Sequence, residues 1–205
     1  GLDDYYDYDT TDKNNKGGLG GGDMMDCNGG DHNAYSKSIL GWITPTVLDL
    51  SDDYSKTKIL LDSYESSGDA LIITKSFNNT YFDEYYILSL YTPDGLNELE
   101  AGNSGLFSKT GITLYHVSAA LSSKQIDCVW DITQNNNATG KIKLIKLIEA
   151  DGKNDIDKEK FSTNNDLYVQ GNVINNLKWN DGTNLDISIQ IKTIKNNQVE
   201  LLISR

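Results

Sequence analysis

The chain has 205 residues, of which 38% are hydrophobic, and a formal net charge of −12 from 18 Lys and Arg against 30 Asp and Glu. This length allows one large or two small domains, with a hydrophobic core that needs no disulfides. The charge argues against nucleic acid and anionic membranes as partners, because phosphate binding needs Lys and Arg. No apolar run of about 18 residues is present, so we expect no membrane-spanning helix.

The N-terminal part of the chain is acidic and rich in glycine. Only Lys13 and Lys16 oppose the Asp residues there, which lie at positions 3, 4, 7, 9, 12, 23, 26 and 31. Such a run is typical of either a solvated acidic face or the surroundings of a metal ion. Glycines on both sides of the Asp-Met-Met-Asp motif at 23–26 allow tight turns with positive φ. We therefore predict a shaped turn, in which the chain's only two methionines pack beneath another group.

A short helix is expected after this turn. Asp31 can cap its N-terminus, and the chain would leave the helix at Gly41 and Pro45. Three apolar residues fall on one helix face at spacings i, i+4 and i+7: Tyr35, Ile39 and Trp42. The sequence texture changes at Thr46, so we place a domain boundary near Pro45, between units 1–45 and 46–205.

From Thr46 onward, short apolar segments recur between clusters of turn residues. Their spacing predicts an antiparallel β-sandwich, with strands at 47–50, 58–61, 70–74, 84–91, 112–117, 128–133, 141–149, 186–194 and 199–204. The segment 141–149 fits a helix about as well as a strand, but its neighbours favour a strand. Alternation is clearest at 185–192, with apolar residues on one face and polar residues on the other. Asn196 and Asn197 then predict a hairpin turn.

Sequence motifs for chemistry are sparse. His32 and His116 lie far apart, neither belongs to H-E-x-x-H, and no nucleotide-binding or serine-hydrolase motif is present. Cys27 and Cys128 lack zinc-ligand spacing, so we expect two buried thiols or one disulfide. The acidic N-terminal loop and the stretch 151–157 both fail the EF-hand pattern, which leaves irregular calcium loops or plain surface loops at each place.

One resemblance is specific. The opening stretch GLDDYYD, then Gly-Gly-x-Asp-Met-Met-Asp, then Gly-Asp-His-Asn-Ala-Tyr-Ser-Lys-x-x-Leu-Gly-Trp, resembles the back half of the catalytic domain in the immune inhibitor A family of secreted bacterial zinc metallopeptidases. The resemblance implies that Asp4 is the third zinc ligand and that residues 23–26 form the Met-turn, with Met25, or alternatively Met24, beneath the zinc. It also implies that His32 or Tyr35 donates a hydrogen bond to the oxyanion.

These two donor roles have structural alternatives. Tyr35 is equally explained as part of the buried face of its helix, and His32 as a surface residue at the helix N-terminus. The resemblance continues through the stretches at 83–88, 111–117, 149–152 and 166–171, which are similar to the sandwich that follows the protease core. His116 lies in one of these strands, where we expect a core or interface histidine without a chemical role.

The resemblance also implies what this chain lacks. The two zinc-binding histidines and the general-base glutamate of H-E-x-x-H would lie in the seven residues before Gly1, and the chain does not contain them. We therefore expect a loop-and-helix remnant of a zincin catalytic domain followed by the sandwich, inactive as an isolated chain. The intact enzyme would be extracellular, would bind zinc together with its missing N-terminal catalytic segment, and would cleave proteins or peptides.

Two other functions remain open. The chain is also consistent with a non-catalytic secreted sandwich that binds carbohydrate or protein, with Trp130 and Trp179 as an exposed aromatic platform. Alternatively, the acidic loop belongs to a structural module that calcium stabilises.

Overall fold

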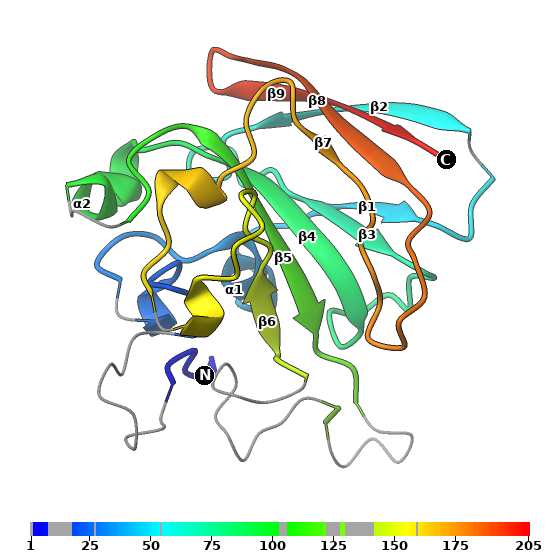
Figure 1. Cartoon of the computed structure of the whole chain (residues 1–205), viewed down its shortest axis with the longest axis horizontal. Coiled ribbons are helices and arrows are strands. Elements are labelled where there is room, and N and C mark those ends of the chain that lie inside the picture. The colour runs from blue at the N-terminus through cyan, green and yellow to red at the C-terminus, as the bar shows by residue number, and fades with distance from the viewer. Residues whose placement is uncertain are drawn as a thin grey trace.

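The structure is a computed structural model that describes residues 2–7, 18–26, 28–53, 55–102, 106–121, 128–129, 142–158 and 160–205. Its strands form two packed sheets (Figure 1), which confirms the mainly β fold and the predicted sandwich. The five-stranded sheet has the order β1 (Thr46–Asp49), β3 (Leu71–Thr74), β4 (Glu84–Tyr91), β5 (Gly111–Ser118) and β6 (Ile145–Leu147). The four-stranded sheet has the order β2 (Lys56–Asp62), β9 (Gln198–Ser204), β8 (Ser188–Lys195) and β7 (Val173–Ile174).

Strand pairing departs from the prediction at one edge. The strands β1 and β3 are parallel, with Thr46 opposite Leu71, whereas the other described pairs are antiparallel. The cause is the path of the chain, which leaves β1, crosses to the other sheet as β2 and returns to β3 in its original direction. The strand at β6 settles the ambiguous 141–149 segment in favour of a strand.

The alternation predicted for the C-terminal hairpin is confirmed. Leu185, Ile187, Ile189 and Ile191 are buried, and the hairpin turn places Asn196 and Asn197 at φ 54° and 57°. Positive φ at both central residues is what a two-residue hairpin requires. The two residues of β7 carry too little pattern to be predicted, and most of the strand predicted at 128–133 lies outside the described residues.

Two hydrophobic clusters occupy opposite faces of the five-stranded sheet. One face packs against the four-stranded sheet through residues such as Leu88 and Ile189. The other face, through residues such as Ile87 and Tyr85, packs against Tyr35 and other residues of the N-terminal segment. The molecule thus has three layers, with the N-terminal segment and α1 (Ala34–Ile39) against the sheet (Figure 1). The boundary near Pro45 stays a prediction, and one hydrophobic cluster spans it.

The helix forms where predicted but differs in two details. Asn33, not Asp31, is the N-cap, because its side chain accepts a hydrogen bond from the Ser36 N–H at 2.9 Å. Trp42 is 63% exposed and does not share the buried helix face. The helix ends at Ile39 and Gly41 turns the chain at φ 72°, so the spacing that would align Trp42 no longer applies.

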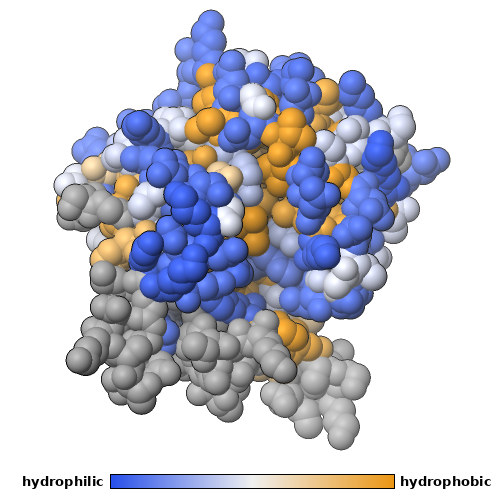
Figure 2. Space-filling view, in the orientation of Figure 1, coloured by the Kyte–Doolittle hydropathy of each residue, from blue (hydrophilic) through white to orange (hydrophobic). Residues whose placement is uncertain are grey.

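The remaining helices are short. Among the described residues they are α2 (Glu98–Ala101) and the 3-10 helices η1 (Met24–Asp26), η2 (Gly95–Asn97), η4 (Ile156–Lys158) and η5 (Asn164–Asp166). In the described part of the chain, none of the helices has the length and apolar content to span a membrane. Figure 2 shows a mostly hydrophilic face with a band of hydrophobic residues down its middle, in keeping with the acidic composition.

Candidate functional site

The glycine-rich turn is held in place by buried polar groups. Asp26 is fully buried, and its Oδ2 accepts hydrogen bonds from the Leu19 and Gly21 N–H groups at 2.8 and 2.9 Å. The Gly20 carbonyl accepts hydrogen bonds from both the N–H and the hydroxyl of Ser162, at 2.7 and 2.9 Å. The turn is therefore fixed to a segment more than a hundred residues away, which makes it a shaped element and not a linker.

Asp23 organises the turn at residues 23–26, which the resemblance predicts to be a Met-turn. Its carboxylate is fully buried; Oδ1 accepts a hydrogen bond from the Met25 N–H at 2.8 Å, and Oδ2 accepts one from the Asn33 N–H at 2.6 Å. The same Oδ1 lies 3.1 Å from His32 Nδ1. One carboxylate therefore links Met25 to His32 and to Asn33, the N-cap of the helix that carries Tyr35.

His32 lies in a charged and aromatic setting. The hydrogen bond to Asp23 raises the pKa of His32, against the opposing effect of desolvation. Asp31 accepts the His32 N–H at 2.8 Å and also contacts the Nζ of the buried Lys37. The ring of Trp42 meets the imidazole edge-on, with centroids 5.6 Å apart. His32 is thus a buried, oriented side chain and not the plain surface residue that was its alternative.

The other predicted site residues surround the same turn. The Tyr5 N–H donates to the Met25 carbonyl at 2.8 Å, so the half-buried Asp4 adjoins a residue that contacts the 23–26 turn. Met25 is half-buried against the first hydrophobic cluster, whereas Met24 is 48% exposed. Tyr35 is buried in that cluster, where burial raises the pKa of its hydroxyl. This position matches the buried-helix-face alternative, and its role as a donor stays a prediction.

The described residues do not by themselves form a zinc site. Within the described ranges, only one group of three or more His, Cys, Asp and Glu side chains places ligand atoms within 4.8 Å of one another, and it contains neither Asp4 nor His32. Protein zinc sites need at least three such ligands. Any zinc bound near Asp4 would therefore need ligands other than the described residues.

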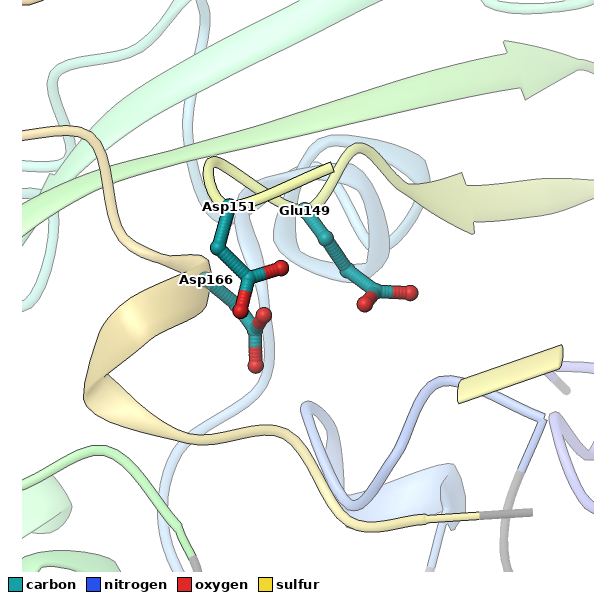
Figure 3. A group of neighbouring side chains, drawn as sticks. All are labelled: Glu149, Asp151 and Asp166. Carbon is teal, nitrogen blue, oxygen red and sulfur yellow. The ribbon is translucent and has the colours of Figure 1, made fainter. Parts of the chain in front are cut away.

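That one group consists of Glu149, Asp151 and Asp166 (Figure 3). The carboxylates of Asp151 and Asp166 lie side by side although they come from separate segments, and Glu149 lies next to them. Burial raises the pKa of both Glu149 and Asp166. The pKa of Asp151 is lowered, because Lys153 Nζ contacts its Oδ2 at 2.6 Å. Oxygen ligands of this kind suit Ca²⁺, which takes six to eight of them.

The two predicted calcium loops have different outcomes. Of the stretch 151–157, only Asp151 joins this group; Asp155 and Asp157 form ion pairs with lysines instead. Most of the acidic N-terminal loop lies outside the described residues. The calcium loop predicted from sequence grouped Asp151 with residues up to 157. In the structure, Asp151 instead lies close to Glu149 and Asp166.

Glu100 is a buried acid that the sequence did not single out. It is 2% exposed, its Oε2 accepts a hydrogen bond from Asn28 at 3.1 Å, and its Oε1 has no partner. Burial raises its pKa from 4.5 to about 7. A raised folded-state pKa contributes stability below the unfolded-state value, and that contribution is lost as pH rises through the folded-state value.

We expect Glu100→Gln to be more stable than the wild type above pH 7, by about 3 kcal/mol, because the variant removes a buried charge but keeps an acceptor for Asn28. The difference should shrink on acidification and vanish below about pH 4.5. Urea unfolding of both proteins at several pH values measures it. Glu98→Gln, at an exposed position of the same helix, is the matched control and should change the free energy of unfolding at pH 8 by no more than about 0.5 kcal/mol. A Glu100→Gln variant that is destabilised at pH 8 would contradict the argument.

His116 is satisfied within the sandwich, as predicted. Its Nε2 lies 2.9 Å from Glu84 Oε1, and its ring stacks on Tyr86 with centroids 4.4 Å apart. Glu84 also accepts the Asn180 N–H at 2.6 Å. The cluster therefore fixes the loop before β8 to the five-stranded sheet.

The aromatic platform is not supported. Trp179 is only 4% exposed and packs in the second hydrophobic cluster, so the prediction of an exposed Trp179 is wrong. The Trp179 side chain is buried because it packs inside the sandwich, where the centroids of its ring and the Tyr86 ring are 5.7 Å apart. Trp130 lies outside the described residues, as does Cys27, so the thiol-or-disulfide alternatives for Cys128 stay a prediction.

The structure also contains a hollow on the outer face of the four-stranded sheet. It has a volume of about 370 Å³ and is lined by polar side chains together with one exposed leucine: Asp62, Thr193, Lys195, Asn196, Gln198, Glu200 and Leu60. No aromatic ring lines it. It therefore offers hydrogen bonds but no stacking surface for a sugar ring.

Sequence reasoning missed Asp23 as the centre of the site. Its position beside the methionines was visible, but its partners His32 and Asn33 are nine and ten residues away and not at a helical spacing. Comparison with known proteins adds nothing to this assignment, because no family model, no curated protein and no solved structure matches the chain.

Proposed function

We propose that this chain is the C-terminal part of a secreted zinc-dependent endopeptidase and acts on protein or peptide substrates only when joined to a preceding segment. The observation that carries the proposal is the contact between the N-terminal segment 2–7 and the predicted Met-turn at residues 23–26. The Tyr5 N–H bonds the Met25 carbonyl, and the Gly18 N–H bonds the Tyr5 carbonyl at 3.0 Å. Asp4 is the neighbour of Tyr5 in the chain, and this pairing therefore supports its proposed role as a third metal ligand near the turn.

The remaining zinc ligands and the general base are assigned to H-E-x-x-H in residues before Gly1, because the resemblance implies that motif there. The chain itself supplies the floor of the site through Met25, one carboxylate through Asp4, and a hydrogen-bond donor through His32. Tyr35 contributes packing beneath them. The isolated chain is accordingly expected to lack peptidase activity.

The test compares this chain with the longer protein that includes its natural preceding residues. We expect the longer protein to cleave casein, to lose activity with a chelator and to regain it with zinc, while the isolated chain stays inactive. Asp4→Ala should reduce zinc retention of the longer protein. A preceding sequence without H-E-x-x-H would refute the proposal, as would unchanged zinc retention in Asp4→Ala.

We also propose that calcium stabilises the fold at Glu149, Asp151 and Asp166. The convergence of the three carboxylates supports this, because two of them are buried and a cation would offset their mutual repulsion. The third already has a cationic partner in Lys153, which a metal ion would displace. Extracellular calcium modules typically bind with dissociation constants of about 10⁻⁴ to 10⁻³ M.

Calcium at about 100 times its dissociation constant should stabilise the chain by roughly 2.7 kcal/mol, and a chelator should reverse the effect. Thermal unfolding with 10 mM calcium or with chelator measures it, at constant ionic strength. Asp166→Asn should abolish the calcium-dependent rise in Tm. Asp157→Asn removes a nearby carboxylate outside the group and should retain it. Equal Tm values with and without calcium would exclude the site.

A further inference from the structure

Asp23 differs from the other acidic residues of the N-terminal segment in what it connects. It accepts hydrogen bonds from two backbone groups that flank the site, the Met25 N–H and the Asn33 N–H, and it also contacts the His32 ring. The side chain is fully buried, so these contacts occur away from bulk water. Asp26, three residues further along the same turn, is equally buried, and among the described residues its carboxylate accepts hydrogen bonds from the Leu19 and Gly21 N–H groups instead.

The geometry constrains where His32 carries its proton. An ionised carboxylate only accepts hydrogen bonds, so the Nδ1 atom at 3.1 Å must carry hydrogen. The ring is thereby held in the tautomer that leaves Nε2 without hydrogen when the imidazole is neutral. Nε2 has no hydrogen-bond partner among the described residues, and the side chain keeps 11% of its surface exposed beside the exposed Trp42.

We infer that Asp23 is the positioning residue for His32, holding its ring so that Nε2 is presented to the carbonyl oxygen of a bound peptide. The positioning is a property of this chain alone. The identity of the substrate rests on the proposed function.

This arrangement makes donation from Nε2 dependent on protonation. With Nδ1 committed to Asp23, Nε2 carries hydrogen only in the imidazolium form. Among the described residues, the charged groups that act on the ring are Asp23, Asp31 and Lys37, and the hydrogen bond that His32 Nδ1 donates to Asp23 favours the imidazolium most. Donation is therefore available below the pKa of His32 and is lost as pH rises through it.

The direct test is nitrogen-15 NMR of the imidazole groups in this chain. The sequence has only two histidines, and His116→Gln identifies the signals of His32. We expect the neutral form of His32 to carry hydrogen on Nδ1. A neutral form with hydrogen on Nε2 would overturn the inference without any variant of Asp23.

Two matched variants separate positioning from general structural effects. Asp23→Asn should lower the pKa of His32 and release the fixed tautomer, whereas Asp26→Asn, which removes a buried carboxylate from the same turn, should leave both unchanged. An unchanged tautomer and pKa in a folded Asp23→Asn protein would refute the role. Equal effects of the two variants would refute it as well.

In the longer protein, Asp23→Asn should lower kcat with little change in KM and shift the alkaline limb of the pH profile to lower pH. A changed KM with an unshifted profile would contradict positioning. If the longer protein has no peptidase activity, the proposed function fails, but the NMR result still decides the relation between Asp23 and His32.

Discussion

Replacing Lys37 by Met should lower the free energy of unfolding by about 3 to 5 kcal/mol, because the change leaves a charged carboxylate buried without its partner. Lys37 is 7% exposed and Asp31 is 3% exposed, and the Lys37 Nζ contacts Asp31 Oδ2. The Nζ atom also lies 4.8 Å from the centroid of the Tyr64 ring. Urea unfolding monitored by circular dichroism at pH 7 measures the loss.

A double variant decides whether the cost comes from the orphaned charge. Lys37→Met combined with Asp31→Asn removes both charges, and it should recover most of the stability lost in Lys37→Met. The matched surface control is Lys58→Met, which breaks the Lys58–Glu200 pair at 2.6 Å, where the Lys58 side chain is 55% exposed. It should cost at most about 1 kcal/mol. A Lys37→Met effect no larger than this control would contradict the argument.

This ion pair illustrates which parts of the fold the sequence can predict. The buried face of a regularly alternating strand such as β8 can be predicted from sequence, because successive side chains point to opposite faces of the sheet. The hairpin turn at Asn196 and Asn197 is equally local. Lys37 carries no such signal: a lysine on a short helix is usually exposed, and only the tertiary position of Asp31 makes burial tolerable.

The candidate site divides in the same way. The resemblance assigns roles to Met25 and His32, which lie in one contiguous stretch of sequence, and these roles stay predictions. The structure links the two residues through Asp23, which accepts hydrogen bonds from the Met25 N–H and from His32. Pairings over long sequence separations were not predictable. Asp166 lies close to Glu149, although the segment between them shows no periodic pattern. The Ser162 hydroxyl donates a hydrogen bond to the Gly20 carbonyl across 142 residues of sequence. The parallel pairing of β1 was missed for the same reason, since it depends on a crossover through the other sheet.

Gly20→Ala should be the most damaging small substitution in the glycine-rich turn, with a loss of about 2 to 5 kcal/mol in the free energy of unfolding. Its φ of 65° costs a residue with a Cβ atom about 1 to 2 kcal/mol. A Cβ atom there would also lie 2.6 Å from the Ser162 backbone N and 2.9 Å from Ile156 Cγ1. Overpacking of this kind typically adds about 1 to 3 kcal/mol.

Two other glycines separate backbone strain from steric conflict. Gly41 has a φ of 72° but open space around its Cβ position, so Gly41→Ala should cost only about 1 to 2 kcal/mol. Gly29 has neither constraint, and Gly29→Ala should be close to neutral. Urea unfolding of the three variants should rank them in that order. If Gly20→Ala costs no more than Gly41→Ala, the turn is not docked on Ser162. The 23–26 turn would then lack the long-range anchor that the Gly20–Ser162 hydrogen bonds provide.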